Sequence, residues 1–269
     1  MKKSFGQHLL TDKNYLRKII GPIDLKPQDT VLEIGSGTGL LTIELAKIAQ
    51  KVYAVEIEKT ILKKLKENIK INKLDNVEII ELDFLKLDLS SLTHNLSPLK
   101  IVGNIPYNIT SKILLKLFGE IDNPASHLNL LKKAFLMLQY EVANRIVAKP
   151  NTKAYSPLTL LVQYFSKPEI LFKVPATAFY PVPKVDSAFV VFNIKDKLPQ
   201  ARNQTLLKNI IRIAFQQRRK KLINSLSKLI EDKNLIIKTF DKLNLDHNFR
   251  AENLNFENYL ALANSIKYQ

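Results

Sequence analysis

The chain has 269 residues, of which 46% are apolar and 25% charged, and its formal net charge is +16. This balance is typical of a globular protein with one domain of ordinary size and a smaller one. The absence of cysteine excludes disulfides and thiolate metal sites, and no apolar run approaches the roughly 20 residues of a membrane span. We expect a monomeric, cytoplasmic protein with no metal and no membrane attachment. The positive charge favours a polyanionic partner, although a lysine-rich genome would produce the same excess.

Hydrophobic periodicity predicts alternating strands and helices from residue 31 onward. A polar lead with helical spacing over 15–20 comes first. Strands are expected at 31–34, 52–55, 77–82, 100–102 and 134–138. Helices are expected at 40–49, 59–71, 110–118, 141–148 and 156–165, and two more β-like runs, 169–174 and 187–194, flank a proline-rich loop. Such alternation predicts a parallel, doubly wound, Rossmann-like α/β sheet with right-handed crossovers.

The last quarter of the chain has a different character. No glycine follows Gly119, and residues 202–268 are helical in pattern throughout. The sequence therefore predicts two domains, an α/β domain over residues 1–197 and a small all-helical domain over residues 198–269.

A glycine turn follows the first expected strand. Gly35, Gly37 and Gly39 are spaced G-x-G-x-G, directly after Glu33 in the strand. Dinucleotide enzymes instead use G-x-G-x-x-G to bring a pyrophosphate to a helix N-terminus. A carboxylate at Glu33 would repel pyrophosphate but suits a cationic ligand. The pattern favours S-adenosylmethionine over a dinucleotide, whereas a glycine turn alone is often only a tight connection.

Acidic residues end the next two strands. Glu56 lies about twenty residues beyond the turn, where an acid can accept both ribose hydroxyls. Asp83, followed by Phe84, is placed to accept from an adenine amine, with Ile57 packing on the ring. The alternative for each acid is a helix N-cap. Their occurrence in register in successive βα units favours a nucleoside cofactor.

The fourth strand leads into Asn104-Ile105-Pro106-Tyr107. The lone pair of adenine N6 is conjugated into the ring, so the amine is a poor nucleophile. Two acceptors aimed at its hydrogens, the Asn104 side-chain oxygen and the peptide oxygen of Ile105 or Pro106, would draw it toward tetrahedral geometry. Pro106 fixes the preceding residue in an extended conformation, and Tyr107 can stack on the base. The alternative is an ordinary proline turn.

With these motifs, the chain resembles the bacterial small-subunit (16S) ribosomal RNA adenine N6,N6-dimethyltransferases over nearly its whole length. Beyond the cofactor and catalytic motifs, the similarity lies in four segments: Lys3–Leu10 (KSFGQHLL), Asn151–Tyr155 (NTKAY), Val174–Ser187 (VPATAFYPVPKVDS) and Ala214–Lys220 (AFQQRRK).

The resemblance implies a class I methyltransferase fold, S-adenosylmethionine as methyl donor, and two neighbouring adenosines near the 3′ end of 16S rRNA, within a pre-assembled small ribosomal subunit, as substrate. It also implies that His8 and Leu10 lie over the methionine end of the cofactor. Phe179 would stack on the base opposite Tyr107, the alternative for Phe179 being a buried core aromatic.

Basic residues near the start of the helical domain form a predicted RNA-binding surface. The sequence places them on one helix: Arg212, Arg218, Arg219, Lys220 and Lys221. Arginine suits phosphate because of its forked geometry. A merely solvated helix face is the alternative, and the family resemblance favours contact with rRNA.

Two other functions compete with the 16S dimethyltransferase. The related erythromycin-resistance enzymes methylate an adenine of 23S rRNA and share the N-terminal and Asn-Ile-Pro-Tyr elements, but the NTKAY and AFQQRRK segments favour the small-subunit enzyme. A ribosome-assembly factor without turnover would not need Asn104, Pro106 and Tyr107.

Overall fold

The computed structural model describes residues 8–92 and 99–266, so Lys3–Gln7 of the N-terminal motif lie outside the described residues. The chain forms two compact units. The α/β unit comprises residues 1–118, 125–143 and 167–195, and the helical unit comprises residues 119–124, 144–166 and 196–269. The domain boundary at residue 197 stays a prediction, since the helical unit also takes in two earlier segments.

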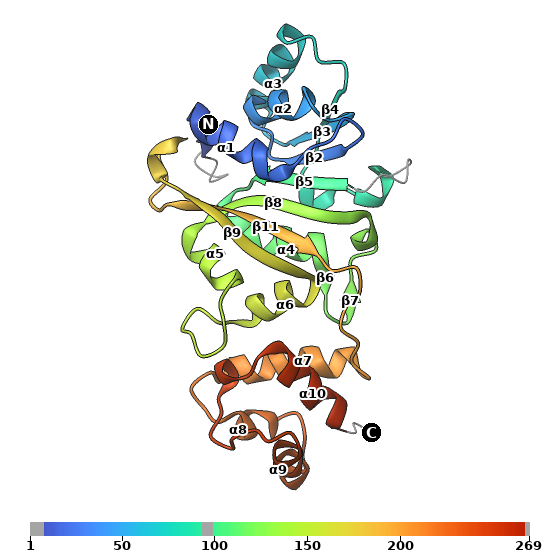
Figure 1. The fold of residues 1–269 in the computed structure, drawn as a ribbon, viewed down its shortest axis with the longest axis vertical. Coiled ribbons are helices and arrows are strands. Elements are labelled where there is room, and N and C mark those ends of the chain that lie inside the picture. Colours follow the sequence, from blue (N-terminus) through green and yellow to red (C-terminus); the bar gives the residue numbers. More distant parts are fainter. Residues whose placement is uncertain (1–7, 93–98, 267–269) are drawn as a thin grey trace. The chain divides into compact units, whose positions relative to one another are not determined.

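The α/β unit is built on a sheet of seven strands within the described chain (Figure 1). In spatial order these are β4 (Val77–Glu81), β3 (Lys51–Glu56), β2 (Thr30–Ile34), β5 (Leu99–Asn104), β8 (Leu131–Gln139), β11 (Ser187–Ile194) and β9 (Ser166–Val174). Each neighbouring pair from β4 to β8 is parallel, which confirms the doubly wound α/β fold. β11 follows β9 after a proline-rich loop instead of a crossover helix, and it runs antiparallel to β8.

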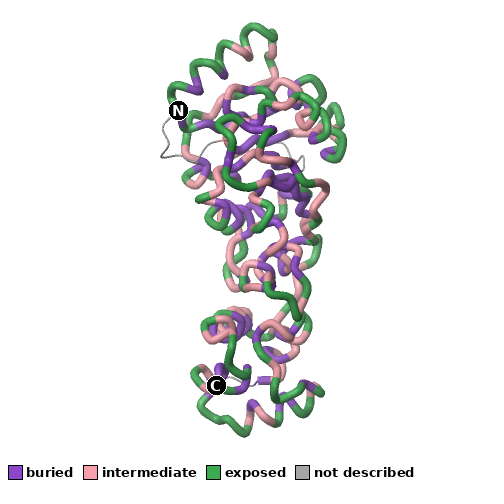
Figure 2. The backbone as a smooth tube through the Cα atoms, turned by 90° about the vertical axis from the view of Figure 1, so that its left-hand side faces the viewer, coloured by how far each residue is buried: buried purple, intermediate pink, exposed green. Residues whose placement is uncertain are grey.

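Helices cover the sheet with their apolar faces. They are α1 (Lys13–Ile23), α2 (Leu40–Ala46), α3 (Lys59–Ile71) and α4 (Thr110–Phe118), whereas α5 (Tyr140–Ile146) is divided between the two units. α1 begins at Asp12, whose carboxylate accepts from the Asn14 N–H, and it buries Ile19 and Ile23 in the same core as Val31 of β2. Most residues of β2, β5 and β11 are buried, whereas β4 at the sheet edge has no buried residue. Figure 2 shows where buried and exposed positions lie along the backbone.

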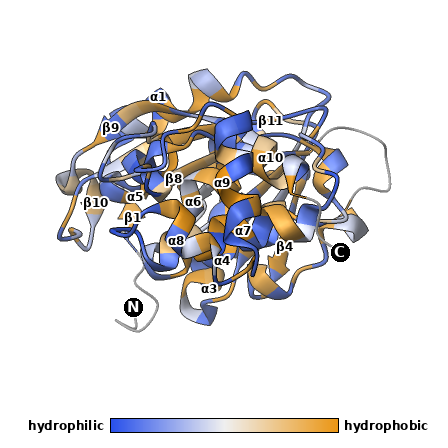
Figure 3. Ribbon diagram, turned by 90° about the horizontal axis from the view of Figure 1, so that it is seen from below, coloured by the Kyte–Doolittle hydropathy of each residue, from blue (hydrophilic) through white to orange (hydrophobic). Residues whose placement is uncertain are grey.

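A separate two-stranded ribbon joins parts of the α/β unit that lie far apart in the sequence. β1 (Leu9–Leu10) pairs antiparallel with β10 (Phe179–Tyr180), with Leu9 opposite Tyr180 and Leu10 opposite Phe179 (Figure 3). The Thr11 N–H donates to the Ala178 carbonyl at 3.0 Å and extends the pairing. The sequence does not predict this N-terminal ribbon, because two-residue strands carry no periodicity.

The helical unit contains α6 (Pro157–Phe165), α7 (Gln204–Gln216), α8 (Leu222–Leu226), α9 (Lys233–Lys242) and α10 (Phe256–Ser265), with a short hairpin of β6 (Gly119–Glu120) and β7 (Asn123–Pro124). Its core includes Tyr155 and Tyr259, both against Phe215 at ring-centroid distances of 6.2 and 6.4 Å. The all-helical pattern expected after residue 202 is confirmed. Among the described helices of the chain, none is long and apolar enough to cross a membrane.

Candidate active site

The candidate site lies where β2 is flanked by β3 on one side and β5 on the other. At this position the strand order reverses, and ligands of open α/β sheets bind at the carboxyl ends of such strands. Two adjoining cavities lie there, both lined in part by the glycine turn. We call the larger the glycine-turn cavity and the smaller the motif cavity. They share the lining residues Leu9, Gly35, Gly37 and Asn104.

Glycine is required at two points of this site. Gly37 has a φ of +57°, and a Cβ there would come within 2.7 Å of Leu9 Cδ2. Gly103 in β5 lies so close to β2 that a Cβ would meet the Ile34 carbonyl oxygen at 2.9 Å. Only glycine therefore allows Leu9 to pack directly on the backbone of the turn and β5 to lie this close to β2.

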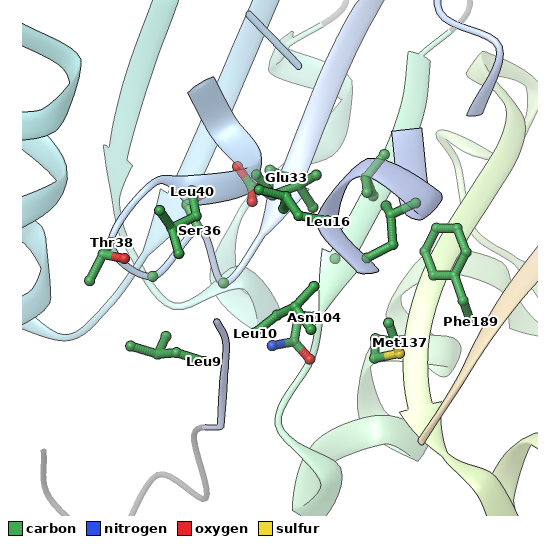
Figure 4. A pocket seen from close by; sticks show the side chains of 16 residues that line it. Leu9, Leu10, Leu16, Glu33, Ser36, Thr38, Leu40, Asn104, Met137 and Phe189 are labelled. Carbon is green, nitrogen blue, oxygen red and sulfur yellow. The ribbon is translucent and has the colours of Figure 1, made fainter. Parts of the chain in front are cut away.

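Glu33 lies in the wall of the glycine-turn cavity (Figure 4). Its carboxylate is 3% exposed and accepts a hydrogen bond from the Thr42 hydroxyl at 2.5 Å. Burial raises the pKa of Glu33 to about 8, the hydrogen bonds from Thr42 and Ser36 oppose this shift, and the nearby charge of Glu56 adds to it. At neutral pH the Glu33 carboxyl is therefore mostly protonated, and a cation that entered the cavity would favour its ionised form.

Glu56 ends β3 in the motif cavity and is 2% exposed. One carboxylate oxygen accepts from the Gly37 N–H at 2.9 Å, and the other accepts from the N–H groups of Ile57 and Glu58, also at 2.9 Å. The side chain thus connects the glycine turn to the end of the neighbouring strand. A carboxylate oxygen has more than one acceptor position, so ribose hydroxyls can still bind to it.

The remaining residues predicted to bind the adenosine do not line these two cavities. Asp83 accepts from the Leu85 N–H at 3.0 Å and begins the 3-10 turn Phe84–Lys86. Phe84 is buried, whereas Ile57 is 44% exposed directly after Glu56. The capping alternative considered for Asp83 is the arrangement observed, and the cofactor roles of these three residues stay predictions.

Asn104 lies at the end of β5, on the border between the two cavities. Its side-chain Nδ2 donates to the His8 carbonyl oxygen at 2.7 Å. Because the nitrogen is held by this carbonyl, the orientation of the amide is fixed and its oxygen lies on the side away from His8. The N-terminal ribbon therefore determines which atom of Asn104 is presented as an acceptor.

Pro106 and Tyr107 complete the motif. Pro106 has φ −59° and ψ 130° and leads into the 3-10 turn Tyr107–Ile109. The Tyr107 hydroxyl forms a 2.5 Å hydrogen bond with the Ser187 hydroxyl, and its ring stacks on the His8 imidazole at 5.6 Å between centroids. Burial raises the pKa of Tyr107 and the Ser187 hydrogen bond partly offsets it, so the phenol stays protonated at neutral pH.

Phe179 is not brought to the lining of either cavity. It is 1% exposed and belongs to the hydrophobic core that also contains Leu10, its cross-strand partner. This is the buried-aromatic alternative considered from the sequence. Stacking of Phe179 on a base stays a prediction.

The predicted basic helix requires a correction. α7 ends at Gln216, because Gln217 leaves helical geometry (φ −126°, ψ 51°), so only Arg212 lies on the helix. The other four residues, Arg218–Lys221, form the loop before α8. Arg218 is paired with Glu252 and donates to the Thr152 carbonyl at 3.1 Å, whereas residues 219–221 are exposed.

Several residues that line the cavities or hold the lining side chains are not apparent from the sequence. Thr42, nine residues beyond Glu33, is indistinguishable from any buried helical threonine until its hydrogen bond is seen. Ser187 carried a signal, as the last residue of the VPATAFYPVPKVDS segment, but not its pairing with Tyr107. Met137 and Phe189 reach the glycine-turn cavity from β8 and β11, which only the strand order reveals.

Comparisons with known proteins agree with this geometry. A family model described as ribosomal RNA adenine dimethylase matches residues 1–268. Two similar proteins are ribosomal RNA small subunit methyltransferases A. That of Acaryochloris marina is 38% identical over 265 residues, covering 98% of this chain and 97% of its own. That of Caldanaerobacter subterraneus subsp. tengcongensis is 39% identical over 269 residues, with the same coverage.

Solved structures show the same similarity. A dimethyladenosine transferase from Plasmodium falciparum superposes with a TM-score of 0.79 at 29% identity, over 95% of this chain and 96% of that one. The 23S rRNA methyltransferase ErmE superposes with a TM-score of 0.74 at 25% identity, over 96% and 98% of the two chains. Both similarities extend through the α/β and the helical regions of the sequence.

Proposed function

The chain belongs to the ribosomal RNA adenine dimethylase family, and on that premise we propose that it transfers methyl groups from S-adenosylmethionine to the N6 amines of two adjacent adenosines near the 3′ end of 16S rRNA. The substrate is the small ribosomal subunit, as the names of its relatives suggest. A monomeric, cytoplasmic enzyme without a metal remains our prediction. The similarity to ErmE makes 23S rRNA the alternative substrate to be tested.

The residues of the two cavities fit this methyl donor. Gly35 and Gly37 line both cavities and carry no side chain, so a ligand there can contact the backbone of the turn. Glu33 and Glu56 are buried acids on adjacent strands, suited to a cationic group and to ribose hydroxyls. When bound, S-adenosylmethionine supplies a methyl group made electrophilic by the attached sulfonium.

Asn104 and the main chain beside Pro106 would activate the amine. The Asn104 oxygen and the peptide oxygen of Ile105 or Pro106 accept the two N6 hydrogens, which concentrates the lone pair on nitrogen for attack on the methyl carbon. Tyr107 holds the ring of the base by stacking. The product ammonium is acidic enough to pass its proton to water, so positioning and electrostatics account for catalysis.

The single observation that carries this mechanism is the hydrogen bond from Asn104 Nδ2 to the His8 carbonyl. Because the amide nitrogen already donates to His8, the amide oxygen is the atom left to accept from the substrate amine. An adenine amine can donate but, with its lone pair conjugated, accepts poorly, and an amide presented nitrogen-first would not bind it.

The test is methyl transfer from tritiated S-adenosylmethionine to unmethylated small ribosomal subunits, with large subunits in parallel. We expect dimethyladenosine in small-subunit RNA, identified by mass spectrometry, and its loss in Asn104→Ala with cofactor binding by calorimetry nearly unchanged. Label only in large-subunit RNA would assign the alternative substrate. Full turnover by Asn104→Ala would overturn the mechanism.

A further inference from the structure

One aromatic side chain at the mouth of the site has no place in the mechanism above. Tyr180 is 67% exposed, although it belongs to β10 and its neighbour Phe179 is fully buried. Successive residues of a strand point to opposite faces, so Tyr180 faces solvent because Phe179 faces the core. A large aromatic exposed to this degree loses hydrophobic stabilisation that burial would provide.

The register of the N-terminal ribbon places Tyr180 beside the cavities. Leu9 is directly opposite Tyr180, and directly opposed residues of an antiparallel pair project from the same face. The Leu9 side chain lines both the glycine-turn cavity and the motif cavity. The Tyr180 ring therefore lies beside Leu9, which lines both cavities, although Tyr180 itself is not one of the lining residues.

The backbone around Tyr180 is held in place on both sides. Ala178 accepts from the Thr11 N–H at 3.0 Å, and the Pro181 carbonyl is 2.6 Å from His8 Nδ1. The same His8 ring stacks on Tyr107. These contacts link the backbone beside Tyr180, through His8, to the ring expected to hold the target base.

The surface next to Tyr180 is mixed apolar and cationic. Val182 and Val185 are 59% and 45% exposed, and Lys184 between them is exposed as well. Sequence-tolerant binding of single-stranded nucleic acid combines these features, an aromatic platform for a base and cations for the backbone. Proteins that recognise RNA loops stack unpaired bases on aromatic side chains.

We propose that Tyr180 stacks on the base of the nucleotide adjacent to the target adenosine and so positions the target in the motif cavity. The inference rests on the proposed function, since it assumes an unpaired RNA substrate. With two adjacent adenosines as targets, the base on Tyr180 would be the second target while the first is methylated. Tyr180 is then a positioning residue, in contact with the substrate but not with the reacting atoms.

The test compares Tyr180→Phe, Tyr180→Leu and Tyr180→Ala on unmethylated small ribosomal subunits. Loss of one base–aromatic stack is expected to lower kcat/KM by about tenfold. We expect that loss in Tyr180→Ala and Tyr180→Leu, and activity near that of the unsubstituted protein in Tyr180→Phe, which keeps the ring. Ile71→Ala, a similarly exposed apolar residue at the end of α3, is the matched control and should be silent.

A change in the substrate separates stacking from a structural role. In reconstituted subunits with uridine in place of the neighbouring adenosine, one target is lost, so the rate is measured at the remaining target adenosine alone. The unsubstituted protein should methylate that adenosine more slowly, because a pyrimidine stacks less well. Tyr180→Ala should lose nothing more, since interacting groups give non-additive effects. Cofactor affinity and thermal unfolding should be unchanged in every variant.

Two outcomes distinguish the proposals. If Tyr180→Ala equals the unsubstituted protein, or if its effect adds to that of the uridine substitution, the stacking proposal is overturned while the methyltransferase assignment stands. If the protein and Asn104→Ala are equally inactive on every ribosomal substrate, the proposed function itself fails.

Discussion

The raised pKa of Glu33 makes the stability of the folded protein depend on pH through a single buried carboxyl. In the folded protein burial raises this pKa to about 8, from an ordinary value of 4.5. Between these pH values the folded state holds a proton that the unfolded chain has released. The favourable contribution of Glu33 is therefore complete below about pH 4.5 and is lost as the pH rises through about 8.

Replacing Glu33 by an uncharged isostere tests this linkage. We expect Glu33→Gln to reduce the fall in unfolding free energy between about pH 5 and about pH 8, because glutamine cannot ionise. Urea denaturation at several pH values measures the slope, with Glu44→Gln on the surface of α2 as the control. Equal slopes for Glu33→Gln and the unsubstituted protein would contradict the raised pKa.

Replacing glycine by alanine should change the free energy of unfolding in opposite directions at two positions. At Gly37 a Cβ meets Leu9 at 2.7 Å in a left-handed conformation, so Gly37→Ala should destabilise by about 1–2 kcal/mol and weaken cofactor binding. At Gly21, in α1, a Cβ meets nothing within 4 Å, and Gly21→Ala should stabilise by about 0.5–1 kcal/mol. Thermal unfolding of both variants checks the pair. Equal shifts would show that the turn tolerates a side chain.

Among the elements, the N-terminal ribbon has the greatest effect on the site for its size. Two paired residues on each strand bring Leu9 over the glycine turn and the His8 carbonyl to Asn104. The seven-stranded sheet does not depend on this pairing. Function should therefore be more sensitive than folding to its loss.

Removing one main-chain donor tests the ribbon. Thr11→Pro deletes the N–H that bonds to Ala178 at 3.0 Å, and misplacement of Asn104 should lower kcat by about ten- to a hundredfold. Thr11→Val keeps the N–H and should retain most activity. Turnover and thermal unfolding should be measured together. Normal turnover by Thr11→Pro would show that the ribbon does not position Asn104.

The long periodic elements are those that the sequence predicts well. α3 and α4 coincide with the expected ranges, because their apolar spacing leaves few alternatives and Asn72 and Gly119 directly follow them. Asn104 and Tyr107 could be found because the Asn-Ile-Pro-Tyr motif has a chemical explanation at a strand end. The ribbon, the burial of Phe179 and the end of α7 depend on tertiary contacts and turn geometry, which local patterns do not contain.

At the scale of the whole chain, the basic residues behind the net charge of +16 do not all have the same role. Arg218 is committed within the helical unit, where its ion pair with Glu252 lies beside the bond from the Asn151 N–H to the Glu252 carbonyl. Arg218 and Asn151 thus join the AFQQRRK and NTKAY segments through Glu252. The exposed loop residues 219–221 are the better candidates for binding phosphate.

A triple charge removal tests this assignment. Arg219→Gln, Lys220→Gln and Lys221→Gln together should weaken binding to small ribosomal subunits. The slope of log affinity against log salt concentration should fall by about one for each phosphate that the loop no longer neutralises. Lys233→Gln, Lys238→Gln and Lys242→Gln on α9 remove the same charge elsewhere. Identical salt slopes for the two triple variants would show that the loop does not contact phosphates and contributes only general electrostatic attraction.

The pairing of Leu9 with Tyr180 also governs when the enzyme becomes competent during its own synthesis. Translation proceeds from the N-terminus, so β1 leaves the ribosome long before its partner strand exists. Until residue 180 has emerged, Leu9 has no strand to hold it over the glycine turn. An incomplete nascent chain therefore lacks a finished cofactor pocket, and methylation waits until translation has passed the VPATAFYPVPKVDS segment.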